Sequence, residues 1–221
     1  VADKTLIPTE QRSNYSEKII FLPNSYQPND CKRSISKKNT TRDDFNLPKD
    51  SFIFCCFNTT YKITPVELDI WSRVLKKVEN SILWLIDSNE ITKKNLLSNF
   101  HKKNIDPKRI IFAKNIPHDE HLERIKHVDL FLDTFNYNAH TTCSDTLWSG
   151  TPIVTKIGDQ FAARVASSLL KSMNLNELIT TSNTEYENLI IELANNKDKL
   201  KKIKDKISNN LSNSPLFDTK K

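Results

Sequence analysis

Glycine is scarce in this chain of 221 residues, which holds only Gly150 and Gly158. The glycine-rich turn of dinucleotide-binding proteins and the phosphate loop of P-loop NTPases both need several positions without a Cβ atom, because the backbone must approach the phosphates closely. Two isolated glycines cannot supply either turn. The sequence therefore excludes both of these nucleotide-binding classes.

Long apolar runs and secretion signals are also missing. No uninterrupted apolar stretch reaches the roughly 18 residues that a membrane span needs. The chain does not open with the basic, apolar and small-residue pattern of a signal peptide. We therefore expect a globular protein that has no membrane partner.

Cysteine is present but sparse. The four cysteines show neither C-x-x-C spacing nor the density of a disulfide scaffold. Cys55 and Cys56 are adjacent in an apolar run, and successive side chains of a strand point to opposite faces, so these two cannot share a metal ion. We interpret the cysteines as small core residues in a reducing compartment, which predicts a cytoplasmic location.

Basic residues are in modest excess, with 33 Lys and Arg against 27 Asp and Glu and a formal net charge of +6. The excess is spread over lysine-rich stretches, among them the run from Lys32 to Arg42 and the C-terminal part of the chain. Such stretches are typical either of a protein with an anionic partner or of a solvated surface. The sequence favours the solvated surface.

From residue 52 onward, short apolar runs alternate with segments of helical periodicity. The runs lack polar alternation, as expected for strands buried on both faces of a parallel sheet. This order predicts an α/β fold, a Rossmann-like doubly wound parallel sheet with right-handed crossovers. The strands read FIFCCF, SILWLI, RIIFA, VDLFLD and PIVT, and helices are predicted over residues 64–78, 91–104, 118–127, 141–150, 161–173 and 183–195, followed by a lysine-rich helix to about residue 210.

Residues 1–50 lack this pattern and are predicted to form a lead-in to the lobe of residues 51–221. The lead-in contains a helical patch over residues 10–15 and a short strand within residues 17–24. A polar stretch with Pro28 and the basic run then follows, and its lack of periodicity is typical of a loop.

One helix start in the lobe is especially well marked. Thr64 is placed as the N-cap, Pro65 as the first helical residue and Glu67 three positions after the cap. This spacing predicts a capping box, in which the threonine and glutamate side chains satisfy backbone N–H groups of the first turn.

Ligands of doubly wound sheets bind beyond the carboxyl ends of the strands, against helix N-termini. The search for a functional site is therefore confined to four turns, over residues 58–62, 87–90, 115–118 and 133–142. No Ser/His/Asp set and no carboxylate pair for acid–base catalysis is evident in them. Asp133, at the end of VDLFLD, is interpreted as structural.

The fourth turn is the most informative of these. His140, Thr141 and Thr142 begin a helix, so backbone N–H groups and two hydroxyls converge where the helix dipole favours an anion. This pattern indicates a diphosphate site that needs no glycine. Asp145, about one turn further on, can accept hydrogen bonds from vicinal hydroxyls such as those of a ribose. The alternative is that one threonine is merely an N-cap and Asp145 a first-turn acid.

Basic and imidazole side chains lie in two other turns. Lys62 follows the first strand and is expected at the same crevice, where an ammonium neutralises phosphate, although a surface lysine is the alternative. His118 and His121 begin a helix, but a metal site would need a third ligand at a fixed spacing. An imidazole stacked on a base, with Arg124 one turn further on, fits the pattern better.

Several motifs in order resemble one family along nearly the whole chain. They read CCFN-x-x-YKITP, SILWL, a proline followed by H-x-x-H, LDTF-x-x-x-x-HTT-x-x-D-x-LW-x-GTP-x-VT, AARVASSLL and SPLFDTK. Together they resemble the C-terminal catalytic half of protein O-GlcNAc transferases and their bacterial SPINDLY-like relatives. The opening YSEKIIFLPNSYQPND is similar to the segment that joins the two halves of that catalytic region.

The resemblance implies the C-terminal lobe of a GT-B glycosyltransferase, a metal-independent, inverting enzyme with a UDP-sugar donor and no cofactor. It implies diphosphate contacts from Lys62, which would stabilise the leaving group, and from the helix start at residues 140–142. Asp145 would hold the ribose. His121 would lie against uracil in a pocket completed by Arg124 and the backbone near Ile116. Thr59 and His118 depart from the animal enzymes, which have glutamine and lysine there. The full donor-binding set is Thr59, Lys62, Ile116, His118, His121, Arg124, His140, Thr141, Thr142 and Asp145.

The resemblance also implies partners that this chain does not contain. The tetratricopeptide repeats of the family would show a 34-residue period, which is absent here, and the N-terminal catalytic lobe that would carry the base is missing. The chain opens on Val1 and has one methionine, Met173, which is typical of a segment of something longer.

The expected function is transfer of GlcNAc from UDP-GlcNAc to Ser or Thr of a protein acceptor. One alternative is a UDP-hexose transferase of the same fold, because sugar choice depends on few contacts. Another is a non-enzymatic basic α/β module that binds nucleic acid or acidic proteins through the run from Lys32 to Arg42 and the lysine-rich C-terminal helix. The absence of exposed aromatics beside the basic runs disfavours nucleic acid.

Overall fold

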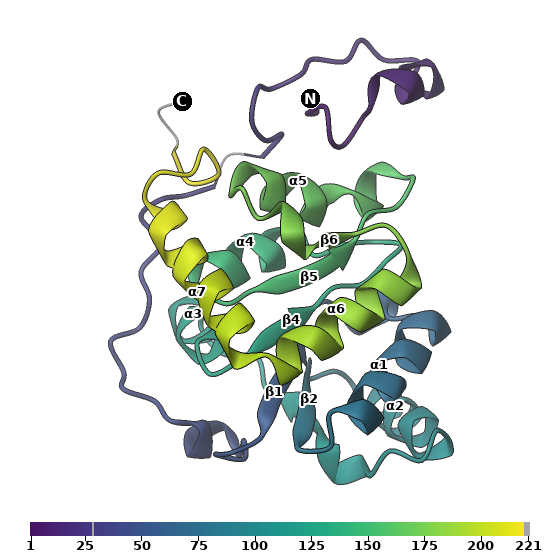
Figure 1. Cartoon of the computed structure of the whole chain (residues 1–221), viewed down its shortest axis with the longest axis vertical. Coiled ribbons are helices and arrows are strands. Elements are labelled where there is room, and N and C mark those ends of the chain that lie inside the picture. The colour runs from purple at the N-terminus through teal and green to yellow at the C-terminus, as the bar shows by residue number, and fades with distance from the viewer. Residues whose placement is uncertain (28, 219–221) are drawn as a thin grey trace.

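A parallel β-sheet of six strands forms the centre of the molecule in the computed structural model, which describes residues 1–27 and 29–218 (Figure 1). The strand order is β3-β2-β1-β4-β5-β6, so the order reverses between β1 and β4. Pro28 and the last two residues of the SPLFDTK motif lie outside the described residues. The predicted doubly wound parallel sheet is confirmed.

The five apolar runs all form strands, namely β1 (Phe52–Cys56), β2 (Ser81–Ile86), β3 (Ile110–Ala113), β4 (Leu130–Leu132) and β5 (Ile153–Lys156). Their side chains are almost all buried, because helices cover both faces of the sheet. Phe54 pairs with Leu83 of β2 on one side and Leu130 of β4 on the other. A sixth strand, β6 (Ile179–Thr180), was not predicted, since two residues are too short to show a pattern.

Helices lie on the two faces of the sheet as right-handed crossovers require. On one face α1 (Pro65–Lys77) packs against α2 (Glu90–Lys102) and α6 (Asn183–Asn195). On the other, α4 (Thr141–Trp148) packs against α3 (His118–Ile125) and α5 (Val165–Ser172). The lysine-rich helix, α7 (Lys197–Leu211), contacts α6 and α4 (Figure 1). No helix among residues 1–27 and 29–218 is long and apolar enough to cross a membrane.

Two local predictions are wrong. The strand expected within residues 17–24 is reduced to a single bridge between Ala2 and Phe21, because no further strand lies beside it. The helix expected over residues 161–173 is split into a 3-10 turn, Phe161–Ala163, and α5. Between them, Arg164 donates to the carbonyls of Thr5 at 2.6 Å and Gly158 at 2.7 Å, and these contacts hold its backbone outside the helical region.

The lead-in of residues 1–50 packs onto the lobe, although it contains little regular structure beyond the 3-10 turns Thr9–Asn14 and Arg42–Phe45. Ala2, Leu6 and Leu47 belong to the hydrophobic core. In Figure 1 this segment runs down one side of the molecule to the start of β1. Its basic part is therefore placed beside α3 and α4.

Candidate functional site

The start of α4 lies where the strand order reverses, the position at which doubly wound sheets bind ligands. His140 is the N-cap residue of α4, and its carbonyl accepts the backbone N–H groups of Cys143 and Ser144. The N–H groups of Thr141 and Thr142 donate to no acceptor within the described part of the chain. Two free donors at the positive end of the helix dipole are suited to an anion.

Asp133 shapes the turn that leads from β4 to α4. One carboxylate oxygen accepts the N–H groups of Thr134 at 2.8 Å and Ala139 at 2.6 Å, and the other accepts the hydroxyl of Thr155 at 2.6 Å. Burial raises the pKa of Asp133 to about 7, although these hydrogen bonds oppose the shift. Because the carboxyl is 0% exposed, it cannot reach a ligand, which agrees with the structural role predicted for it.

Glu67 ties the same turn to the opposite face of the sheet. The predicted capping box is present: Thr64 caps α1, and Oε2 of Glu67 accepts the backbone N–H of Thr64 at 2.9 Å. The other oxygen, Oε1, accepts the backbone N–H of Phe135 at 2.8 Å. A helix-capping residue of α1 thus also supports the loop in front of α4.

Lys62 comes to this loop from the 3-10 turn Thr60–Lys62 after β1. Its Nζ donates to the carbonyl of Asn138 at 3.1 Å and lies 3.8 Å from the ring centroid of Tyr137. Burial lowers the pKa of Lys62, while the charge of Asp133 opposes this shift. The half-buried ammonium therefore lies beside the start of α4, as the sequence predicts.

The ring of His140 lies beside Lys62 at the start of α4. It stacks on Tyr137 with the centroids 4.7 Å apart, and Nε2 lies 3.3 Å from the carbonyl oxygen of Ala162. Burial lowers the pKa of His140, and the nearby charge of Lys62 lowers it further. The imidazole is therefore neutral near pH 7, and Lys62 carries the positive charge here.

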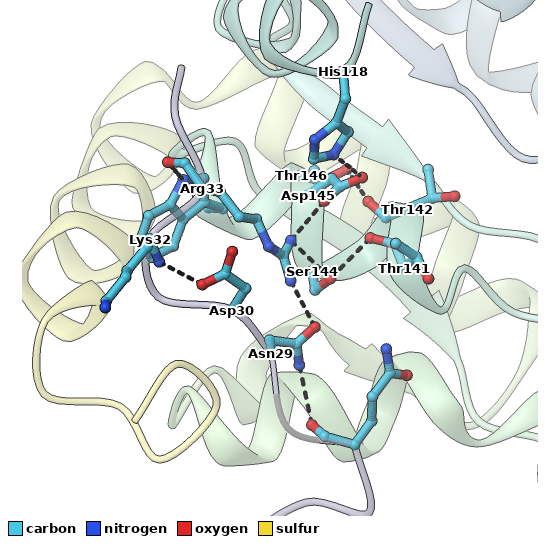
Figure 2. Close-up of polar contacts among 12 residues, drawn as sticks. Asn29, Asp30, Lys32, Arg33, His118, Thr141, Thr142, Ser144, Asp145 and Thr146 are labelled. Atoms are coloured by element: carbon cyan, nitrogen blue, oxygen red, sulfur yellow. Dashed lines mark hydrogen bonds and ion pairs between the residues drawn. The ribbon is translucent and has the colours of Figure 1, made fainter. Parts of the chain in front are cut away.

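Asp145 lies one turn into α4 between two basic groups (Figure 2). Its Oδ1 is 2.6 Å from Nη1 of Arg33, and its Oδ2 is 3.2 Å from Nε2 of His118. The Asp145 side chain is only 8% exposed, whereas that of His118 is 57% exposed. The helix starts after the third and fourth turns thus meet at Asp145, and Arg33 is a further partner that the sequence does not predict.

His121 and Arg124 form a second pair on α3. The guanidinium of Arg124 donates from Nε to Nδ1 of His121 at 2.9 Å and lies over the rings of Phe57 and Trp84. Burial, with a smaller contribution from Arg124, lowers the pKa of His121 to about 3. The imidazole is therefore neutral and carries its proton on Nε2. Arg124 is 2% exposed and holds the His121 ring in place through this hydrogen bond.

A pocket of about 250 Å³ adjoins this pair, lined by Ile116 and Arg124 together with Trp84 and Phe112 of the sheet. His121 does not line it. A larger cavity of about 760 Å³ lies at the opposite edge, beside the amino ends of β1 and β2. Ligands of this fold bind at the carboxyl edge, so cavity size alone does not locate the site.

The predicted residues thus fall into three groups: Lys62 with His140, Asp145 with His118, and His121 with Arg124. Thr59 is exposed as the N-cap of the 3-10 turn and has no side-chain hydrogen bond within the described residues. Sequence reasoning missed Arg33 and the ring of Tyr137. Position in the fourth turn was a usable signal for Tyr137, whereas Arg33 was hidden in a run interpreted as solvated.

The basic run is largely paired with acidic groups of the lobe. Arg33 binds Asp145, Lys38 binds Glu120, and Arg42 binds Asp129 at 2.8 Å. Among residues 1–27 and 29–218, no group of three or more His, Cys, Asp or Glu side chains is arranged to hold a metal ion.

A sequence model described as "Glycosyl transferase family 41" matches residues 33–221. The "Probable UDP-N-acetylglucosamine--peptide N-acetylglucosaminyltransferase SEC" of Arabidopsis thaliana is 36% identical over 99% of this chain and 23% of its own length. The "UDP-N-acetylglucosamine--peptide N-acetylglucosaminyltransferase" of Caenorhabditis elegans is 36% identical over 82% of this chain and 16% of its own length. The chain thus spans less than a quarter of each of these relatives.

Solved structures agree with this likeness. A mutant of the O-GlcNAc transferase of Thermobaculum terrenum superimposes with a TM-score of 0.83 at 25% identity, over 99% of this chain and 41% of that one. The match places the fold among the GT-B glycosyltransferases, as the sequence motifs predict.

Proposed function

The chain belongs to glycosyl transferase family 41, and from this premise we propose that it is the nucleotide-sugar-binding lobe of an O-linked protein glycosyltransferase. The donor in this proposal is UDP-GlcNAc and the acceptor is Ser or Thr of a protein. The relatives named above are described as UDP-N-acetylglucosamine–peptide N-acetylglucosaminyltransferases, which supports this donor. The acceptor cleft and the catalytic base belong to the remaining length of the whole enzyme.

One observation carries the proposal. Lys62 contacts the loop that leads into α4, and His118 contacts Asp145 one turn into the same helix, while the N–H groups of Thr141 and Thr142 at its start are unpaired within the described residues. A diphosphate at this helix start would meet two backbone donors and the Lys62 ammonium. A ribose beside it would meet Oδ2 of Asp145, and a base would extend towards His121.

Charge development on the leaving UDP explains how this arrangement would serve group transfer. As the bond between the sugar and the β-phosphate breaks, negative charge grows on the phosphate oxygen. Fixed donors aimed at that oxygen stabilise the transition state without reorganising, which is the largest contribution in many enzymes. In this proposal Lys62 and the N–H groups at the start of α4 have this role.

Calorimetric titration of the chain with UDP, with ADP as the control, tests the proposal. UDP is expected to bind at least about tenfold more tightly, because a pocket built for one base leaves its polar groups unpaired with another. Equal affinity for the two nucleotides, or no binding at millimolar ligand, contradicts it. Titration with UDP-GlcNAc and UDP-glucose then distinguishes the two candidate sugars.

Metal independence is part of the same proposal. The diphosphate charge would be met by Lys62 and helix N–H groups, so no hard cation with carboxylate ligands is required. UDP binding is expected to be the same in EDTA and in Mg²⁺. A requirement for Mg²⁺ or Mn²⁺ contradicts this point.

A cytoplasmic, reducing location is also proposed. It is supported by Cys55, Cys56 and Cys143, which are buried thiols in the core. Burial raises the pKa of each of them, and a thiol that stays protonated is inert towards oxidation.

A further inference from the structure

Arg33 reaches α4 from the lead-in and binds two side chains of this helix and one of the lead-in itself (Figure 2). Its Nη1 lies 2.6 Å from Oδ1 of Asp145 and 3.2 Å from Oγ of Ser144. Its Nη2 lies 2.8 Å from Oδ1 of Asn29. Both terminal nitrogens of the guanidinium are therefore engaged.

Burial makes this contact persistent. The Arg33 side chain is 10% exposed, and its guanidinium lies 5.7 Å from the ring centroid of Phe217. The carbonyl of Arg33 accepts the indole N–H of Trp148 at 3.3 Å, so backbone and side chain are both fixed on α4. An arginine this enclosed is not part of a solvated basic surface, and removing it would leave a buried carboxylate without its partner.

The contact divides the two oxygens of Asp145 between different tasks. Oδ1 is occupied by Arg33, while Oδ2 is directed to the exposed imidazole of His118 at 3.2 Å. The guanidinium that binds Oδ1 is itself held by Asn29 and Ser144, so the carboxylate of Asp145 keeps one orientation. Oδ2 is therefore presented in one place at the mouth of the site.

We propose that Arg33 is a positioning residue for the donor nucleoside, holding Asp145 so that Oδ2 can accept hydrogen bonds from the ribose hydroxyls. The inference rests on the proposed function, since it requires that the site bind a uridine nucleotide. Arg33 itself does not touch the ligand. It acts through Asp145, so its loss should affect the recognition of the ribose hydroxyls rather than that of the phosphates.

The test measures how strongly the chain prefers UDP to 2′,3′-dideoxy-UDP, a probe that lacks both hydroxyls. The wild-type preference is expected to be about tenfold or more, as for the loss of a hydrogen bond to a charged group. Arg33→Ala and Asp145→Ala should each reduce it to near one, and the double variant should lose nothing further. Lys32→Ala is the matched control and should keep the wild-type preference, because within the described residues Lys32 is bonded only through its backbone N–H, to Asp30 at 2.8 Å.

Arg33→Lys adds a rescue arm. A lysine can pair with Asp145, but its single nitrogen cannot replace the separate guanidinium nitrogens that bind Asp145 and Asn29, so an intermediate preference is expected. If Arg33→Ala does not fold, as judged by circular dichroism, this variant decides: a reduced preference supports the inference, and an unchanged one overturns it.

The outcomes separate the two proposals. A wild-type chain that binds neither nucleotide overturns the proposed function and this inference together. If UDP binds and Arg33→Ala retains the preference, only the inference fails. Equal weakening of both nucleotides by Arg33→Ala would assign Arg33 a role in attracting phosphate, which also overturns it.

Discussion

Lys62 is the single residue whose chemistry is easiest to separate from its neighbours. Its Nζ lies beside the start of α4 and contacts only a carbonyl and an aromatic ring within the described residues. Lys62→Ala should weaken the binding of UDP by about 1.5 to 3 kcal/mol, or roughly 10- to 150-fold in affinity, because a charge-assisted contact to phosphate is lost. Uridine has no phosphate and should be affected little.

Calorimetry with both ligands measures this difference. Lys94→Ala, on the exposed face of α2, serves as the control for a general change in charge. If Lys62→Ala weakens uridine as much as UDP, Lys62 is not a phosphate ligand.

His121 should make stability depend on pH. Its pKa is about 3 in the folded chain, because of burial and Arg124, and about 6.5 when unfolded. The unfolded chain therefore takes up a proton first, so stability that is complete above pH 6.5 is lost as the pH falls. This proton uptake should lower the free energy of unfolding by about 1 to 2 kcal/mol between pH 7 and pH 5.

Urea unfolding of the wild type and of His121→Gln at both pH values measures this contribution. Glutamine does not titrate, so the variant should lose less stability between pH 7 and pH 5 than the wild type. The same loss in both proteins would mean that His121 is not neutral in the folded state.

These residues differ in how far they could be predicted. Lys62 and His140 were expected at the same crevice because each follows a predicted strand, and the structure adds that their strands, β1 and β4, are neighbours. Arg33 could not be placed, because its segment has no periodicity and a long side chain reaches in many directions. Only the fold brings it to Asp145, 112 residues away.

Among the elements, the start of α1 affects both the stability of its own helix and the loop before α4. Glu67 caps this helix and also accepts the N–H of Phe135 in the loop before α4. Thr64→Ala should cost about 1 kcal/mol of stability, the usual value for an N-cap. Glu67→Ala should lower the free energy of unfolding by about 2 to 4 kcal/mol, because the buried N–H of Phe135 is left unpaired as well. This variant should also bind UDP more weakly.

Ser182→Ala is the matched control for this experiment. Ser182 caps α6 by accepting the N–H of Glu185 at 3.1 Å, and its side chain has no hydrogen bond to the loop before α4 within the described residues. Ser182→Ala should lower the free energy of unfolding by about 1 kcal/mol and leave UDP affinity unchanged. Thermal unfolding and calorimetry on the same samples give both numbers. If Glu67→Ala behaves like Ser182→Ala, the loop does not depend on Glu67.

Element bounds were predictable where local signals were strong. The helix predicted over residues 183–195 matches α6, because Ser182 marks its start and its apolar residues keep helical spacing. The helix predicted over residues 141–150 ends earlier, at Trp148, because Gly150 adopts the left-handed φ of 81° that follows a helix. The split before α5 was not predictable, because it depends on contacts of Arg164 with distant carbonyls.

For the whole molecule, we expect donor binding without transfer by these 221 residues alone. Group transfer requires donor and acceptor in near-attack geometry, which supplies about 7 to 11 kcal/mol of the barrier reduction. Incubation with labelled UDP-GlcNAc and acceptor peptides measures transfer. The full-length enzyme is the positive control. Comparable transfer rates for the two would show that one lobe carries the whole machinery.

The packing of the lead-in has a consequence for synthesis on the ribosome. Asp3 accepts a hydrogen bond from the hydroxyl of Ser168, 165 residues later in the chain. Arg33 likewise binds Asp145, which is translated after it. At roughly 5 to 20 residues per second, about 8 to 33 s pass between translation of Asp3 and of Ser168. During that interval Ala2, Leu6 and Ile7, all buried in the folded protein, lack the later part of the core that covers them. A chaperone that binds exposed apolar segments would therefore hold these residues until α5 has been translated.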